Sequence, residues 1–68
     1  MEKARTNTYM MYTISTFDGK AKCNIHCCPQ QRWDVVFNEN KKQVILNRQN
    51  VSFTIPKKDF DENWTVLE

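Results

Sequence analysis

The chain has 68 residues and a net charge of +2, from ten basic and eight acidic side chains. That length allows one small domain and excludes most large enzyme folds, because a domain of this size buries only about 60% of its unfolded surface. No apolar run approaches the ~20 residues that span a bilayer, and residues 1–5 do not lead into an apolar signal segment. With three cysteines, an odd number, a disulfide framework is not expected. We therefore expect a single cytoplasmic domain over residues 1–68, without a membrane segment.

The composition favours β-structure. The chain holds nine Val or Ile, six Thr and eight aromatic residues, against two Ala and two Leu. β-branched and aromatic side chains suit a pleated sheet and lose rotamer freedom on a helix. The predicted fold class is therefore all-β.

The first predicted element is a hairpin, preceded by residues 1–6, which we expect to be frayed. Asp18-Gly19 is typical of a two-residue type I′ turn. This turn sets Ile14, Tyr12 and Met10 opposite Cys23, Ile25 and Cys27 on one mainly apolar face. Since the alternation of apolar and polar residues agrees with the turn, both signals predict the same register. The other face would carry Tyr9, Met11, Phe17, Lys20, Lys22 and His26.

Two further turns follow Pro29, which ends the first hairpin. A loop at Asn40-Lys41 sets Phe37 opposite Val44, whereas a loop at Glu39-Asn40 would set Phe37 opposite Lys42. A loop at Gln49-Asn50 sets Leu46 opposite Phe53. The side chains expected to face the core from these strands are Trp33, Val35, Phe37, Val44, Leu46, Val51, Phe53 and Ile55.

The last segment begins after Pro56. Residues 57–63 are expected to form a turn or a single helical turn. Residues 64–67 are expected to form a final short strand, with either Trp64 and Val66 or Thr65 and Leu67 facing the core. The whole is predicted to be an antiparallel meander of five to six short strands, curled into a small SH3-like or OB-like barrel. The apolar face could also be covered by an end segment packed across it, or by a second subunit that completes the sheet, a homodimer, which is our second choice.

The run from Cys23 to Cys28, which includes His26, raises the question of a metal site or a catalytic pair. Zinc takes about four Cys or His ligands in a tetrahedron. On a strand, however, Cys23 and Cys27 point to one face while His26 and Cys28 point to the other. His26 and Cys28 would also stand nearly 7 Å apart, too far for a nucleophile and its base. We therefore expect no metal, no cofactor and no catalytic residue.

Charge is distributed unevenly along the chain. Residues 1–58 carry all ten basic side chains and four acids, a net charge of +6, whereas residues 59–68 carry four acids and no base. A basic body with an acidic tail is compatible with binding to a polyanion or to a charged protein surface.

These features predict a non-enzymatic binding protein of the inhibitor or adaptor type, the kind of small chain often encoded by viruses or mobile elements. Aromatic and Met side chains are enriched at protein interfaces. The residues expected to contact a protein target are Tyr9, Met11, Phe17, Asp59, Asp61 and Glu62. The alternative is a small nucleic-acid-binding barrel with a basic and aromatic face. Its contacts would be Tyr9, Lys20, Lys22, Lys41, Lys42 and Arg48.

Overall fold

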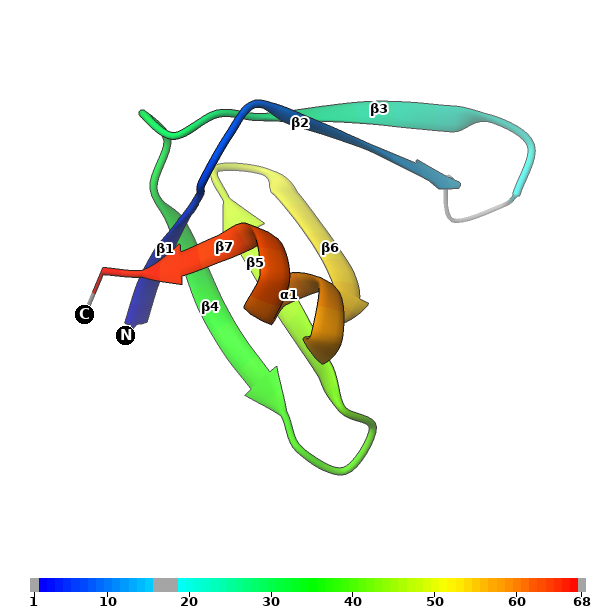
Figure 1. Ribbon diagram of the computed structural model, residues 1–68. Coiled ribbons are helices and arrows are strands. Elements are labelled where there is room, and N and C mark those ends of the chain that lie inside the picture. The colour runs from blue at the N-terminus through cyan, green and yellow to red at the C-terminus, as the bar shows by residue number, and fades with distance from the viewer. Residues whose placement is uncertain (1, 16–18, 68) are drawn as a thin grey trace.

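A computed structural model describes residues 2–15 and 19–67 of the chain. Within them the protein is mostly β, so the predicted all-β class is confirmed, but it has seven strands and one helix where five to six strands were predicted. The elements are β1 (Glu2–Thr6), β2 (Met10–Ser15), β3 (Lys22–Cys27), β4 (Trp33–Asn38), β5 (Gln43–Arg48), β6 (Val51–Pro56), α1 (Lys57–Asn63) and β7 (Trp64–Val66). Figure 1 shows their arrangement as a main sheet, a hairpin formed by β2 and β3, and the helix.

The main sheet contains the two predicted turns in the predicted registers. Its strand order is β6-β5-β4-β1-β7, and all described neighbours are antiparallel. Phe37 lies opposite Val44, and Leu46 lies opposite Phe53. The backbone N–H of Lys42 donates to the carbonyl of Glu39 at 3.4 Å and closes the first of these turns.

The expectation that residues 1–6 are frayed is wrong for residues 2–6, which form β1. β1 lies inside the main sheet, where it pairs with β4 on one side and with β7 on the other. Ala4 and Thr6 are completely buried. Their small side chains alternate with Lys3 and Arg5, so the segment has little hydrophobic signal, and backbone pairing on both sides holds it in place. The same insertion means that the main sheet is not a simple meander.

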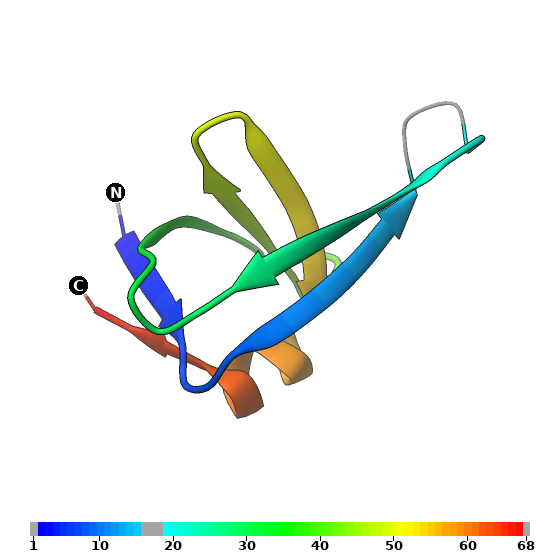
Figure 2. The ribbon, with the colours of Figure 1, turned by 90° about the horizontal axis from the view of Figure 1, so that it is seen from above.

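The β2–β3 hairpin has the predicted register, with Tyr12 opposite Ile25 and Met10 opposite Cys27. The predicted turn residue Asp18 lies outside the described residues. One correction concerns Cys23, which was expected to face the core and is instead exposed. Its end of the hairpin extends past β6, so no part of the main sheet lies beneath it (Figures 1 and 2).

The core lies between the inner face of the main sheet and the two elements that cover it. α1, seven residues long, is nearly two turns and so exceeds the single turn predicted. Its Phe60 stacks on Trp64, with ring centroids 5.9 Å apart, and meets Phe37 edge-on at 5.6 Å. The hairpin covers the other end through Tyr12, whose ring lies 5.1 Å from that of Phe53. Of the eight predicted core residues, Phe37 and Val51 are only partly buried, although both pack against the core.

The two sheets do not close into a barrel within the described residues. β2 and β3 pair with each other and cross the main sheet as a separate layer (Figure 2). Within the same residues, no helix is long and apolar enough to cross a membrane. The fold is therefore an open main sheet with one face covered by a helix and a hairpin.

Candidate functional site

The hairpin presents an exposed face with large side chains, here called the outer hairpin face. Its members alternate with the core-facing residues of β2 and β3 and are all exposed: Tyr9, Met11, Thr13, Lys22, Asn24 and His26. Tyr9 is 61% exposed and Met11 51%, and these are among the most exposed large hydrophobic side chains of the described residues. Such a concentration of Tyr and Met is typical of contact surfaces.

The side chains of this face are ordered by contacts within it. The hydroxyl of Tyr9 is hydrogen-bonded to Nδ1 of His26, and their ring centroids lie 5.8 Å apart. Met11 lies directly opposite His26 across the strands. The hydroxyl of Thr13 donates to Oδ1 of Asn24 at 3.0 Å. Cross-strand pairs of this kind reduce the rotamer entropy that would be lost when a partner binds.

The opposite face of the hairpin is attached to the body through Tyr12. Its hydroxyl donates to Oδ2 of Asp59 at 2.7 Å and accepts the indole N–H of Trp64 at 3.0 Å. Burial of the Tyr12 ring raises the pKa of its hydroxyl, and the carboxylate of Asp59 raises it further, whereas the Trp64 hydrogen bond lowers it. Tyr12 therefore stays a neutral donor and joins β2 to both α1 and β7.

The structure divides the residues predicted to contact a protein. Tyr9 and Met11 lie together on the outer hairpin face, whereas Phe17 lies outside the described residues. The carboxylate of Asp59 accepts hydrogen bonds from Tyr12 and Asn63, on the inner side of the hairpin. Asp61 forms an ion pair with Lys57 at 2.9 Å on the exposed side of α1. The acidic residues therefore do not share a surface with Tyr9 and Met11.

The basic residues predicted to contact nucleic acid are not gathered into one patch. Lys41 and Lys42 lie in the turn before β5, whereas Arg48 ends that strand, about 20 Å away for six extended residues. Arg48 is half-buried, with its guanidinium 6.0 Å from the centre of the Trp33 ring. Lys22 lies on the hairpin, at the end that projects from the body (Figure 1). These basic residues therefore lie on separate parts of the fold.

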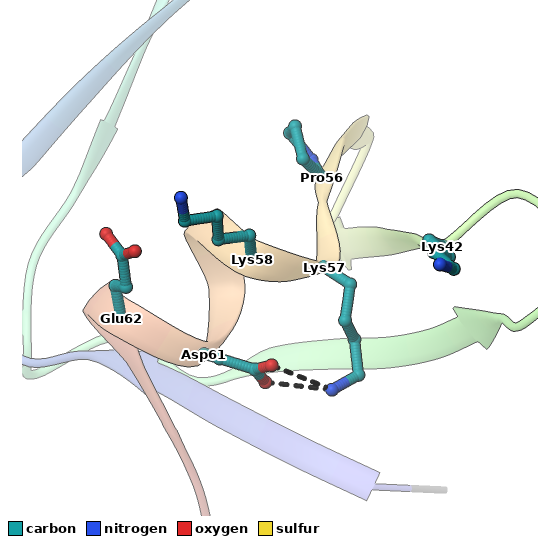
Figure 3. A pocket seen from close by; sticks show the side chains of 6 residues that line it. All are labelled: Lys42, Pro56, Lys57, Lys58, Asp61 and Glu62. Carbon is teal, nitrogen blue, oxygen red and sulfur yellow. Dashed lines mark hydrogen bonds and ion pairs between the residues drawn. The ribbon is translucent and has the colours of Figure 1, made fainter.

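One shallow pocket of about 560 Å³ lies beside the start of α1. Its lining residues are Lys42, Pro56, Lys57, Lys58, Asp61 and Glu62. Figure 3 shows Lys57 turned toward Asp61, to which it is ion-paired. The pocket therefore mixes both signs of charge, and its chemistry points to no particular ligand.

The cysteines are spread over different environments. All three are free thiols; Cys23 is exposed, Cys28 is half-buried and Cys27 is fully buried. Burial raises the pKa of the Cys27 thiol to about 11, with a further contribution from the neighbouring Cys28. A thiol with a raised pKa is a poor nucleophile and a poor metal ligand. Within the described residues, no group of three or more His, Cys, Asp or Glu side chains is placed to hold a metal ion.

Two features of the site were missed by sequence reasoning. The contact between Tyr9 and His26 was not predicted, although both were assigned to the same face of the hairpin. The bond from Tyr12 to Asp59 joins residues 47 positions apart, and no local pattern indicates it. The only usable signal was the phenolic hydroxyl on an otherwise apolar face, since a partly buried Tyr hydroxyl normally finds a partner.

Comparison of the chain with protein-family models, with curated protein sequences and with solved structures finds no match.

Proposed function

We propose that this protein is a non-enzymatic binding protein that contacts a protein target through the outer hairpin face. The observation that carries the proposal is the pair of exposed side chains, Tyr9 at 61% and Met11 at 51%, on a hairpin whose other side is attached to the core. Exposed aromatic and Met side chains on a supported backbone provide apolar anchors at a small entropic cost. A role as a stoichiometric inhibitor or adaptor suits a single small domain of this kind.

Protein is favoured over nucleic acid by the placement of charge. Binding to a nucleic-acid backbone draws its affinity from several basic side chains that contact successive phosphates. Here Lys41 and Lys42 lie at one end of β5 and Arg48 at the other, half-buried over Trp33. On the outer hairpin face, Lys22 lies opposite Ser15, at the other end of the hairpin from Tyr9. The target is therefore expected to be held by apolar contacts, with a weak dependence on salt.

The test is a quantitative affinity capture from lysate with three forms of the protein. The wild type is compared with a double variant, Tyr9→Ser with Met11→Ser, and with a control, Val36→Ser. Val36 is also an exposed apolar residue, at 42%, but it lies on β4 away from the hairpin. All three changes are on the surface, where substitutions usually alter stability by less than about 0.5 kcal/mol. Each capture is run with and without nuclease and over a series of salt concentrations.

The expected result is a stoichiometric protein that the wild type and the Val36→Ser control retain and the double variant loses. Retention should survive nuclease treatment and moderate salt. If the three forms capture the same proteins equally, the outer hairpin face is not the contact surface. If DNA or RNA is recovered and binding falls with a log–log salt slope near −0.9 per phosphate contact, the protein is a nucleic-acid binder instead.

A further inference from the structure

Strand β6 (Val51–Pro56) forms an edge of the main sheet and, among the described residues, pairs with β5 alone. Natural sheets usually protect such edges with charged residues, a proline, a bulge or a covering segment. β6 has no charged residue, and its six consecutive pairs with β5 contain no bulge. Its proline, Pro56, stands at the last position and leaves the rest of the edge able to pair.

The sequence of β6 is complementary to itself when two copies run antiparallel. Centred on Phe53, such a pairing sets Val51 of one copy opposite Ile55 of the other on the inner face. On the outer face it sets Ser52 opposite Thr54, both of which are exposed. Apolar residues therefore meet apolar residues, hydroxyls meet hydroxyls, and the two Phe53 rings form a cross-strand aromatic pair. A shift by one residue would place apolar against polar faces.

The hairpin extends over the same edge. Figures 1 and 2 both show β2 and β3 running past β6 into the space where a second sheet would continue. The inner side of this projecting end carries the exposed Cys23 and, opposite it, the partly buried Ile14. Val51, the first residue of β6, is also only partly buried. A second copy paired at β6 would lie next to these side chains.

We propose that two copies of this chain associate through β6, with antiparallel pairing centred on Phe53 that joins their main sheets into one continuous sheet. A two-fold axis at Phe53 makes the interface isologous, with each strand serving as donor and acceptor for the other. The paired segment is short, about 17 Å for five residues, so the interface lies at the small end of the range for specific complexes. The dimer is accordingly reversible and depends on concentration.

This association goes beyond the proposed function and is independent of it. A dimer would carry two outer hairpin faces, one for each copy, and would present them to a target together. Two linked sites bind a target with matching spacing more tightly than one site does. Because the association is measured on purified protein without any target, failure of the target-binding test leaves the dimerisation result unaffected.

The test measures self-association by sedimentation velocity over a wide concentration range. It compares the wild type with two β6 variants that carry opposite charges. One variant carries Ser52→Lys with Thr54→Lys, and the other carries Ser52→Glu with Thr54→Glu. In the proposed register, each variant places like charges directly opposite each other across the interface, and this destabilises the pairing of the two strands. A mixture of the two variants opposes Lys to Glu. The control is Gln43→Lys, an exposed change on β5, a strand that lies inside the sheet.

We expect the wild type and the Gln43→Lys control to dimerise with rising concentration. Each edge variant should remain monomeric alone, and the mixture should form a heterodimer. Amide exchange in the wild-type segment Val51–Ile55 should also slow as concentration rises, a readout that does not depend on any variant. A wild type that stays monomeric at every concentration, or a dimer that the edge variants leave intact, would overturn the proposal.

Discussion

At the scale of single residues, the buried ionisable groups make the fold sensitive to alkali. The Cys27 side chain is fully buried, and desolvation raises its pKa to about 11 from an ordinary value of 9.0. The pKa of Tyr12 is raised as well, chiefly by burial. Both groups are neutral in the folded protein at neutral pH. Neither therefore carries a charge that the core would have to accommodate.

We predict that stability falls as pH rises above 9. A thiol whose folded pKa is raised contributes its full stabilisation below its unfolded pKa, and this is lost as pH rises from there toward 11. A shift of this size corresponds to a loss on the order of 2 kcal/mol by the time pH reaches the folded pKa. Urea unfolding as a function of pH measures it. Cys27→Ala should flatten part of the decline, the remainder being due to Tyr12, whereas Cys23→Ala should change nothing. If the stability of Cys27→Ala falls with pH as steeply as that of the wild type, the loss is not due to ionisation of Cys27.

The same two cysteines show what can be read from the sequence at this scale. Alternation places Cys23 and Cys27 on the same face of β3, and the structure confirms that shared face. Burial, however, depends on whether another layer lies beneath the residue. The main sheet underlies Cys27 but not Cys23, and this depends on where the hairpin crosses the sheet. Periodicity predicts which face of a strand a side chain points to. It does not predict whether another layer of the protein buries that side chain.

At the scale of elements, α1 carries two aspartates in very different roles. Asp59 accepts from the Tyr12 hydroxyl at 2.7 Å and from the Asn63 amide at 2.9 Å, and it is partly buried. Asp61 forms an i,i+4 ion pair with Lys57 in which both side chains are well exposed. Exposed ion pairs contribute little to stability, because water and salt screen them. Only the first aspartate connects separate elements.

We predict that Asp59→Ala destabilises the protein by about 1–3 kcal/mol, because it removes the carboxylate that accepts from the partly buried Tyr12 hydroxyl. The Asn63 amide loses one acceptor but keeps the backbone carbonyl of residue 59. Asp61→Ala, the matched control on the same helix, should cost about 0.5 kcal/mol or less. Chemical denaturation of the two variants under identical conditions gives both values. Equal losses would show that Asp59 has no special part in holding the hairpin to the helix.

The elements differ in how well their sequence predicts them. All three described hairpin registers follow from local turns and alternation, because neighbouring strands pair across a short loop. β1 has no such local partner. Its neighbours β4 and β7 lie about 30 and 60 residues away in the chain, and its outward side chains are charged. The network from Tyr12 to Asp59 and Trp64 is equally non-local, which is why it was not predicted.

At the scale of the whole molecule, coverage of the inner sheet face explains why the expected barrel is not observed. A meander of this size must hide its apolar face by curling or by covering it. Here α1 covers one end through Phe60, and the hairpin covers the other through Tyr12. With the face covered from both ends, the described strands bury their core without closing on themselves. The edge at β6 consequently remains available.

The final prediction concerns β1, on which the integrity of the main sheet depends. Deletion of residues 2–6 should abolish the cooperative fold, because it removes the strand between β4 and β7 and uncovers Trp33 and Trp64, which face Ala4 and Thr6 across the sheet. Near-UV circular dichroism and the dispersion of amide resonances measure the loss. The control is Lys3→Ala, which removes an exposed ion pair with Asp34 but keeps the strand, and should cost less than about 1 kcal/mol. A frayed N-terminus would instead predict that the deletion is harmless, so a folded truncated protein would contradict the topology of the main sheet.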